Sequence, residues 1–307
     1  MSGEFSVVEL SEDQLPAVVR LCRAALDPVR DAPEAAEIIA RLRESPGRTP
    51  GLVAVVGGEV AGVALSSVGS RDRHSGHLDL LAVAPGHQRA GVGRALLAGT
   101  ERLLAAAGAH EVRLAGNPPY YAWPGVDVGY TPAICLARRS GYRQDRTAWN
   151  MSVDLTDDSR VAQLRTADDE HRLAAAGITV RRAAATDRDA LAAAVEAHFA
   201  GAWPVEVAHS IGRAGAGCQV ALRGGQLLGF AAYGSARPSW FGPMGTFPGA
   251  TGLGIGRVLL RRCLRDQYAA GVRSVQIGWV GPEPFYADAV GARIERVFFQ
   301  FRKSLRP

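Results

Sequence analysis

The stretch HQRAGVGRALL, residues 87–97, places two glycines two positions apart and then continues directly into an apolar helical pattern. After Gly91 and Gly93 the apolar residues recur at the spacing of one helix face. The preceding HLDLLAVAP, residues 77–85, is apolar enough to form a largely buried strand. The sequence therefore predicts a strand, a glycine loop and a helix in direct succession.

The same pattern occurs twice in the chain. GVGRALL at 91–97 recurs as GIGRVLL at 254–260, 163 residues later. Two further segments match in the same order: AAAGAHEVRLAG (105–116) with YAAGVRSVQIGW (268–279), and GGEVAGVAL (57–65) with GGQLLGFAA (224–232). Three matched segments in one order predict a duplicated domain.

Each half has the same predicted order of elements. A strand leads to helices, a hairpin that turns at Gly-Gly, a further strand, the glycine loop with its long helix, a buried strand, a short helix and a final strand. The charged, helix-favouring segment 157–177 separates the halves. We therefore predict an N-terminal domain over 1–156, a helical linker over 157–177 and a C-terminal domain over 178–307.

The composition indicates an ordinary globular protein. Of the 307 residues, 47% are hydrophobic and 21% are charged. Acidic and polar residues interrupt the N-terminal apolar run, so we expect no signal peptide. Glu59 and several glycines break the longest apolar tract into two strands, which argues against a membrane span of about 20 residues. We expect a cytoplasmic protein with no membrane partner.

The charge and cysteine patterns exclude two kinds of site. The net charge of +5 is spread over helix faces and forms no basic run with interleaved aromatic residues, so we expect no nucleic-acid partner. The four cysteines lack the paired spacing of a zinc site, and we expect no metal. The sequence leaves the oligomeric state open, with a homodimer as one candidate assembly.

The glycine loop has the properties of an anion site. The first turn of a helix leaves N–H groups unpaired at the positive end of the helix dipole, and glycine lets the backbone approach a ligand. A phosphate-binding P-loop would need a Lys-Ser/Thr pair after the glycines, and this pair is absent. A dinucleotide fingerprint is also poorly matched, because no second βαβ unit with an acidic ribose contact follows. A diphosphate on convergent amides fits the loop better.

VAPGHQRAGVGRALL, residues 83–97, resembles the acyl-CoA pyrophosphate motif of the GNAT N-acetyltransferase superfamily, Gln/Arg-x-x-Gly-x-Gly/Ala. Gln88, Gly91 and Gly93 match it. In the second half Gly254 and Gly256 match, and Thr251 stands where Gln or Arg is usual. The resemblance covers nearly the whole chain as two tandem copies. It implies an α/β (α+β) fold of two GNAT domains, each a mixed, mostly antiparallel sheet flanked by helices.

The resemblance also implies acetyl-CoA as the cofactor. The residues that it assigns to the cofactor surround both glycine loops, with a backbone N–H near residues 81–83 meeting the developing oxyanion. In the first half they are Leu81, Ala82, Val83, Gln88, Arg89, Ala90, Gly91, Val92, Gly93 and Arg94. In the second half they are Thr246, Thr251, Gly252, Gly254, Ile255, Gly256 and Arg257.

Two titratable residues of the first half are candidates for the catalytic base. Strand alternation predicts His77 and Asp79 on one face, with Leu78 and Leu80 on the other. The alternative is that both lie at a frayed strand start and face water. The second half has Trp240 and Gly242 at these positions and lacks this candidate.

The catalytic acid shows the opposite distribution. GNAT enzymes often carry a tyrosine in the short helix after the buried strand, placed to protonate the thiolate, and Tyr286 in PFYADAVGA resembles it. One extra residue separates Tyr286 from Gly291, and the alternative is a packed helix aromatic. In the first half Tyr130 replaces the usual asparagine and Ala137 replaces the tyrosine, so another group donates the proton or the thiolate leaves unaided.

The first half also inserts NPPYYAWPGVD, residues 117–127, which the second half lacks. Its prolines and glycine predict a shaped loop, and Asp127 is a candidate partner for a substrate ammonium. The candidate substrate residues are Tyr120, Tyr121, Trp123 and Asp127. The alternative is an interface plug that holds the two halves together.

The resemblance implies transfer of an acetyl group from acetyl-CoA to an amine by direct attack in a ternary complex. We expect the first half to be the catalyst, with a small-molecule amine as its partner. The alternatives are an acyl-CoA-binding regulatory module or pseudoenzyme, and a protein lysine acetyltransferase. The sequence does not identify the acceptor, because loop shape sets such pockets.

Overall fold

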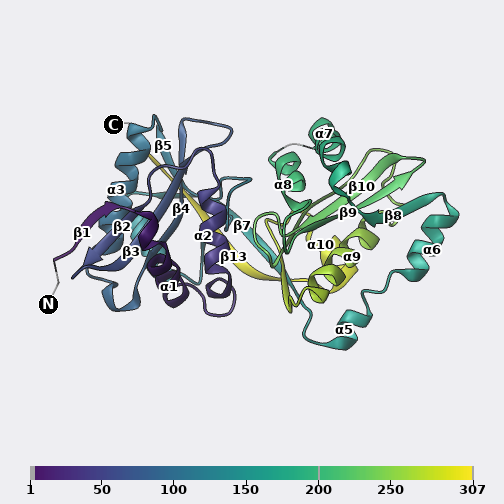
Figure 1. The fold of residues 1–307 in the computed structure, drawn as a ribbon, viewed down its shortest axis with the longest axis horizontal. Coiled ribbons are helices and arrows are strands. Elements are labelled where there is room, and N and C mark those ends of the chain that lie inside the picture. Colours follow the sequence, from purple (N-terminus) through teal and green to yellow (C-terminus); the bar gives the residue numbers. More distant parts are fainter. Residues whose placement is uncertain (1–3, 200, 306–307) are drawn as a thin grey trace. The chain divides into compact units, whose positions relative to one another are not determined.

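A computed structural model describes residues 4–199 and 201–305 (Figure 1). The chain forms two compact units. Unit 1 comprises the described residues up to Ala148 and from Val297 onwards, and unit 2 spans Trp149–Arg296. Each unit is a mixed, mostly antiparallel sheet with helices on its faces, which confirms the predicted fold class.

The sheet of unit 1 is antiparallel except where β4 and β5 run parallel. Its order is β1 (Ser6–Glu9), β2 (Leu52–Val56), β3 (Glu59–Val68), β4 (Ser75–Val83), β5 (Glu111–Leu114) and β13 (Arg293–Ser304), and the short β6 (Val126–Asp127) pairs with β13. The predicted Gly-Gly hairpin joins β2 to β3, and both glycines have positive φ. The sheet is thus a run of hairpins that ends in one parallel pair.

Alternation along β2 and β3 assigns the helices of unit 1 to opposite faces. Val53 and Val63 pack in one cluster with α1 and α2, whereas Ala54 and Ala64 pack in another with α3. The helices are α1 (Leu15–Ala25), α2 (Ala35–Arg43), α3 (Val92–Ala106) and α4 (Thr131–Arg139). The predicted strand, glycine loop and long helix are β4, residues 84–91 and α3.

Unit 2 repeats this architecture, as the internal repeat predicts. Its sheet has the order β7 (Arg143–Asp154), β12 (Ser274–Ile277), β11 (Trp240–Thr246), β10 (Gln226–Tyr233), β9 (Gly217–Arg223) and β8 (Ile178–Arg182), with β11 and β12 parallel. The helices are α5 (Asp158–Ala162), α6 (Ala167–Ala175), α7 (Arg188–His198), α8 (Trp203–Ser210), α9 (Ile255–Ala269) and α10 (Glu283–Val290). Short 3-10 turns lie at Glu12–Gln14, Ala32–Glu34, Pro85–His87 and Ala185–Asp187. Helix α9 corresponds to α3, and each begins after a glycine with positive φ.

The structure divides the chain at other places than the predicted boundaries 1–156 and 178–307. The part of β7 from Trp149 onwards belongs to unit 2, where residues 151–154 pair with β12. The part of β13 from Val297 onwards belongs to unit 1, where residues 301–304 pair with β5. The segment 157–177 forms α5 and α6, and its Leu164 and Leu173 lie in the core of unit 2. It therefore packs as part of that unit.

None of the helices in the described part of the chain is both long and apolar enough to cross a membrane.

The C-terminal strand carries a large share of the unit 1 core. Phe301 is opposite Leu114 of β5 and is buried to 1% exposure, in a cluster with Leu97, Leu104 and Val112. Unit 1 therefore completes its core only when the end of the chain is in place.

We predict that Phe301→Ala destabilises unit 1 by about 3–5 kcal/mol, because it leaves a large cavity in a packed core. The measurement is the free energy of unfolding in urea. The control is Ile294→Ala in the same strand, whose side chain is 53% exposed and whose loss we expect to change stability by less than about 1 kcal/mol. Equal effects of the two variants would contradict the role assigned to Phe301.

Candidate functional site

The glycine loop leads into the N-terminus of α3, where several backbone N–H groups have no partner within the helix. Gly91 is the N-cap residue with φ 91°, and the first helical hydrogen bond runs from Ala95 N–H to the Gly91 carbonyl at 3.0 Å. The N–H groups of Val92, Gly93 and Arg94 thus have no acceptor within the helix. Successive left-handed and right-handed backbone turns of this kind form concave anion sites.

Two further features complete this loop. Arg89 has a positive φ of 65°, and together with Arg94 it adds positive charge beside the helix N-terminus. The Gln88 side-chain amide donates to the Val83 carbonyl at 3.2 Å, which ties the loop to the end of β4. Apart from its neighbours in the chain, no atom of the described residues would lie within 4 Å of a Cβ placed at Gly91, so the backbone there faces open space. The loop therefore fits a diphosphate.

β4 and β5 separate beside this loop. Their parallel pairing ends at His77 and Arg113, β5 ends one residue later, and β4 continues to Val83. On its other edge β4 pairs with β3 through a bulge at Asp79, which has no partner residue in β3. Bulges bend a strand and re-aim its side chains. The result is a wedge between β4 and β5.

The ladder also determines where the backbone groups of β4 point. Ala84 N–H bonds to Ala61 on β3 at 2.9 Å, and alternate residues of an antiparallel strand face the same partner. Ala82 therefore faces β3, whereas Leu81 and Val83 direct their N–H and C=O groups away from it, toward the wedge. This is the predicted position of the oxyanion donor.

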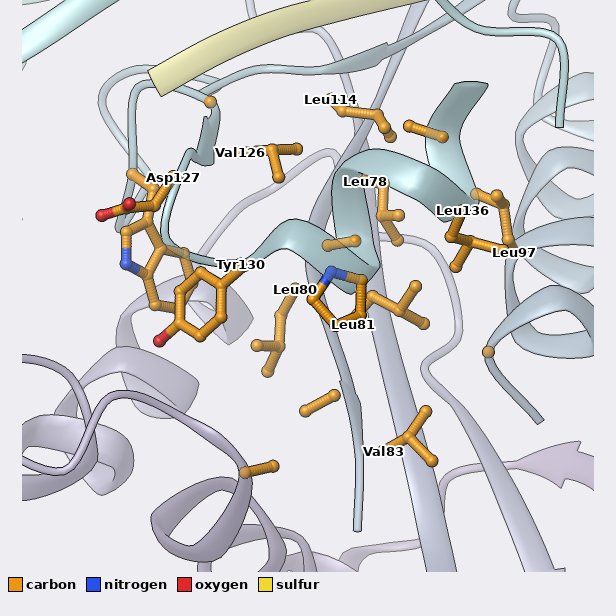
Figure 2. Close-up of a pocket in the computed structure, with 18 of the residues that line it drawn as sticks. Leu78, Leu80, Leu81, Val83, Leu97, Leu114, Val126, Asp127, Tyr130 and Leu136 are labelled. Atoms are coloured by element: carbon orange, nitrogen blue, oxygen red, sulfur yellow. The ribbon is translucent and has the colours of Figure 1, made fainter. Parts of the chain in front are cut away.

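A cavity of about 480 Å³ occupies the wedge and reaches the glycine loop (Figure 2). Its wall comes from β4, the end of β5, the loop before α3, α4 and the segment 121–130. Among the predicted site residues, the structure brings into this wall Asp79, Leu81, Ala82, Val83, Gln88, Arg89, Gly91, Gly93, Arg94, Tyr121, Trp123 and Asp127. His77, Tyr120, Ala90 and Val92 do not line it.

Asp79 is one of the titratable groups in this wall. Burial raises the pKa of its carboxyl to about 8, against a smaller opposing effect of the Ser67 hydroxyl. Its Oδ1 is inaccessible to solvent and has no hydrogen-bond partner among the described residues. A carboxyl with a pKa near the working pH and a free acceptor atom can take up a proton.

His77 has a different environment. Its ring Nδ1 lies 3.0 Å from the Ala115 carbonyl, and burial lowers the pKa of the imidazole, so the ring is neutral at pH 7. The bulge at Asp79 interrupts the alternation that predicts both residues on one face. Of the two predicted bases, only Asp79 lines the cavity.

One end of the cavity carries polar groups. Figure 2 shows Asp127 and Tyr130 together there. The Tyr130 hydroxyl accepts a hydrogen bond from Asp27 N–H at 2.6 Å and donates to the buried Asp31 at 3.0 Å, which fixes the ring. Asp127 accepts from Gly129 N–H at 2.7 Å. Tyr120 instead packs under the Arg41 guanidinium, 4.8 Å from its ring centre.

The sequence interpretation missed Tyr130 as a wall residue. It considered Tyr130 only as the replacement for a family asparagine. Its position at the N-cap of α4, three residues after the inserted loop and two before Pro132, was the available signal. Its hydrogen bonds to residues about 100 positions earlier could not be read from the sequence.

The corresponding loop of unit 2 has the same backbone and different neighbours. Gly254 caps α9 with φ 80°, and an Arg172 nitrogen lies 3.2 Å from the position of its Cβ. A Cβ at Gly256 would meet Phe285 at 3.4 Å and Met244 at 3.5 Å. Of the other predicted residues, Thr246 ends β11, Ile255 is buried, and Thr251, Gly252 and Arg257 are exposed. Aromatic and thioether side chains therefore border the helix start in unit 2.

Tyr286 lies in the hydrophobic core of unit 2. It is 7% exposed, and its ring packs edge-on against Phe241 and Phe285, with ring centres 6.2 and 5.1 Å away. Burial raises the pKa of its hydroxyl to about 12. These contacts are those of a packed helix aromatic, and its assignment as a catalytic acid stays a prediction.

Residues 15–122 match the family described as Acetyltransferase (GNAT) family. No curated protein matches the sequence. The chain is similar in structure to a fungal multi-domain GH3 beta-N-acetylglucosaminidase with a GCN5-related glucosamine N-acetyltransferase region. The TM-score is 0.74 at 19% identity, over 98% of this chain and only 38% of that protein.

Two other solved structures match along nearly their whole length. One is a tandem GNAT protein from the clavulanic acid biosynthesis pathway, with a TM-score of 0.70 and 19% identity over 99% of both chains. The other is a GCN5-related N-acetyltransferase from Sphaerobacter thermophilus, with a TM-score of 0.65 and 20% identity over 99% of this chain and 96% of that one. The predicted tandem GNAT fold is confirmed.

The environment of Asp79 generates a stability prediction. An ordinary aspartate ionises near pH 3.9 in the unfolded chain, whereas Asp79 keeps its proton up to about pH 8 in the folded protein. We predict that the folded protein loses stability relative to Asp79→Asn as the pH rises from 4 to 8. The measurement is the Tm of both proteins at several pH values without ligand.

The control is Asp13→Asn, which removes an exposed carboxylate from the same unit. A difference in Tm between the wild type and Asp79→Asn that does not change with pH would contradict the raised pKa.

Proposed function

We propose that this chain, which has the tandem GNAT fold and matches the acetyltransferase (GNAT) family over residues 15–122, transfers an acyl group from acetyl-CoA to an amine of a small molecule. The observation that carries the proposal is a single cavity in unit 1 whose wall includes both the glycine loop and Asp79. The residues proposed to bind the cofactor, the proposed proton acceptor and the polar residues at one end therefore all line the same cavity.

Residues 88–94 supply the contacts for the cofactor diphosphate. Unpaired N–H groups of the first turn of α3, the helix dipole and the Arg89 and Arg94 guanidinium groups all favour an anion there. The absence of any protein atom near the Gly91 Cβ position leaves room for the ligand. The outward-facing groups of Leu81 and the N–H of Val83 offer hydrogen bonds along the strand edge, whereas the Val83 carbonyl already accepts from the Gln88 side chain.

Acetyl-CoA, when bound, supplies a thioester carbonyl carbon on which the amine nitrogen forms a bond as the C–S bond breaks. A lysine-like amine has a pKa near 10.4, so only about one molecule in 2,500 is neutral at pH 7. The ionised form of Asp79, which reaches half of the molecules at about pH 8, accepts the proton that the amine loses. The products are the amide and the thiol form of CoA, whose proton balances the one taken from the amine.

The polar end of the cavity suits the acceptor. Asp127 provides a carboxylate for an ammonium group, and Tyr130 provides aromatic surface beside it. Trp123 also lines the cavity. The Tyr130 ring is held by two hydrogen bonds, so this surface is preorganised. A small cationic amine would enter from this end and reach Asp79.

Unit 2 serves a structural role in this proposal. Phe285 and Met244 border the helix start beside Gly256, and Tyr286 is packed in the core. The proposed acyl transfer takes place in the cavity of unit 1.

An acyl-CoA-binding module without turnover is the second candidate. The observation in its favour is that α4 contains no tyrosine that could protonate the leaving thiolate. Binding of acetyl-CoA without CoA release across a panel of amines would support it, whereas CoA release that depends on one amine would exclude it.

We predict that Gly91→Val weakens acetyl-CoA binding by tenfold or more. A β-branched residue resists the φ of 91° and would fill the space that faces the diphosphate. The measurement is calorimetric titration, read for affinity and stoichiometry. Gly58→Val is the matched control, since Gly58 has φ 88° and equally open surroundings in the β2–β3 turn.

The same titration with Gly254→Val separates the units. We expect unchanged affinity and stoichiometry if unit 1 holds the site. Loss of a binding event in Gly254→Val would assign a second site to unit 2. A folded wild type that binds no acetyl-CoA would exclude the proposed function.

We predict that Asp79→Asn lowers kcat by about a hundred- to ten-thousand-fold with little change in acetyl-CoA affinity. The pH profile of kcat/KM should bend near pH 8, where Asp79 ionises, and the bend should be absent from the variant. The assay is thiol release with the best amine of a panel, with Asp13→Asn as control. An unchanged profile in Asp79→Asn would show that another group takes the proton.

A further inference from the structure

The unit 1 cavity has a second, apolar end, lined by leucine side chains. Figure 2 shows Leu78, Leu97, Leu114 and Leu136 together there, apart from Asp127 and Tyr130. Leu80 and Leu81 lie between the two ends. The wall of the cavity is therefore polar at the end with Asp127 and Tyr130 and apolar at the end with the four leucines.

This end is built from residues just beyond the contacts that the cofactor needs. Leu97 follows Gly93 by four residues on the same face of α3, about 6 Å deeper along the helix. Leu78 and Leu114 are the first residues past the last β4–β5 pair. Their side chains line the bottom of the wedge.

Small residues on α4 keep this end open. Ala133 and Ala137 are four residues apart, so they share one helix face, and both line the cavity beside Leu136. Ala137 is 1% exposed and has no atom beyond Cβ to fill the space in front of it. A larger side chain at either position would project into the cavity.

We infer that unit 1 takes a straight-chain acyl thioester longer than acetyl, whose hydrocarbon tail lies in this apolar end. The inference rests on the proposed acyl-CoA function and names the class of acyl group. An apolar tail gains free energy by leaving water there. The leucine side chains give a terminal carboxylate no partner, so a dicarboxylic acyl group is disfavoured unless it reaches Arg94 or Arg139, which line the same cavity.

Calorimetric titration of the full chain with CoA, acetyl-CoA, butyryl-CoA, hexanoyl-CoA and succinyl-CoA tests the inference. Full burial strengthens binding about fourfold per methylene, so we expect hexanoyl-CoA to bind at least about tenfold more tightly than acetyl-CoA. Succinyl-CoA has the four-carbon chain of butyryl-CoA with a terminal carboxylate, and we expect it to bind more weakly than butyryl-CoA.

In the variant Ala137→Leu, hexanoyl-CoA should bind no more tightly than acetyl-CoA, because the leucine side chain fills the apolar end. The affinity of this variant for CoA itself should be unchanged. If this variant has a lowered Tm because its buried site is overpacked, Ala133→Leu tests the same space from a partly exposed position. The matched control is Ala106→Leu, on an exposed turn of α3 outside the cavity, which should keep the chain-length gain.

The outcomes separate the inference from the proposed function. No binding of any of the five compounds would exclude the acyl-CoA function itself. Binding of CoA with equal affinities for acetyl-CoA and hexanoyl-CoA would overturn the inference alone. A chain-length gain that persists in both alanine variants would place the tail elsewhere and would also overturn it.

Discussion

The parting of β4 from β5 after the His77–Arg113 pair is the constraint on which the site depends. Two adjacent parallel strands normally satisfy each other's backbone groups, and buried groups without partners are costly. Here β4 continues for six residues beyond its last pair with β5, and the ladder to β3 leaves Leu81 and Val83 facing the gap. The backbone groups of β4 that face the gap need hydrogen-bond partners from a ligand or from water. A ligand with amide and carbonyl groups meets that requirement, and the glycine loop at the end of the same strand provides for its charged end.

The bulge at Asp79 connects this geometry to the chemistry. An unpaired residue in a central strand places a carboxyl where the strand bends, in surroundings dominated by leucine. Such surroundings disfavour the ionised form, which is why burial is the main cause of the raised pKa. The same burial that makes Asp79 a usable proton acceptor near pH 8 makes the ionised folded state less stable. Functional groups in proteins are often kept in surroundings that lower the stability of the fold, and the desolvated carboxyl of Asp79 has that character.

Local signals were read correctly from the sequence, and pairings between distant segments were not. The glycine loop, the long helix and the Gly-Gly hairpins depend on residues within one turn, and the repeat indicated two copies of one architecture. The domain boundaries depend on which strands β7 and β13 pair with, a choice between partners more than 100 residues away that no local pattern encodes. The alternation that predicted His77 and Asp79 on one face assumed a regular ladder, and a single bulge invalidates it. The backbone of the glycine loop was therefore predictable in detail, whereas the placement of Asp79 without His77 in the cavity wall required the structure.

The two units show why a helix N-terminus alone does not define a cofactor site. Gly91 and Gly254 have nearly the same φ, and each starts a 15-residue helix, so the backbone contribution to anion binding is equivalent. That contribution is only about 0.3–2 kcal/mol per charge, too small to hold a ligand without further contacts. The second glycines are also similarly surrounded: a Cβ at Gly93 would meet Leu136 at 3.4 Å and Val83 at 3.6 Å, and one at Gly256 would meet Phe285 at 3.4 Å and Met244 at 3.5 Å. The repeat preserves the part of the motif that the backbone determines. What distinguishes the loop of unit 1 is that β4, the end of β5 and α4 surround a cavity that reaches it.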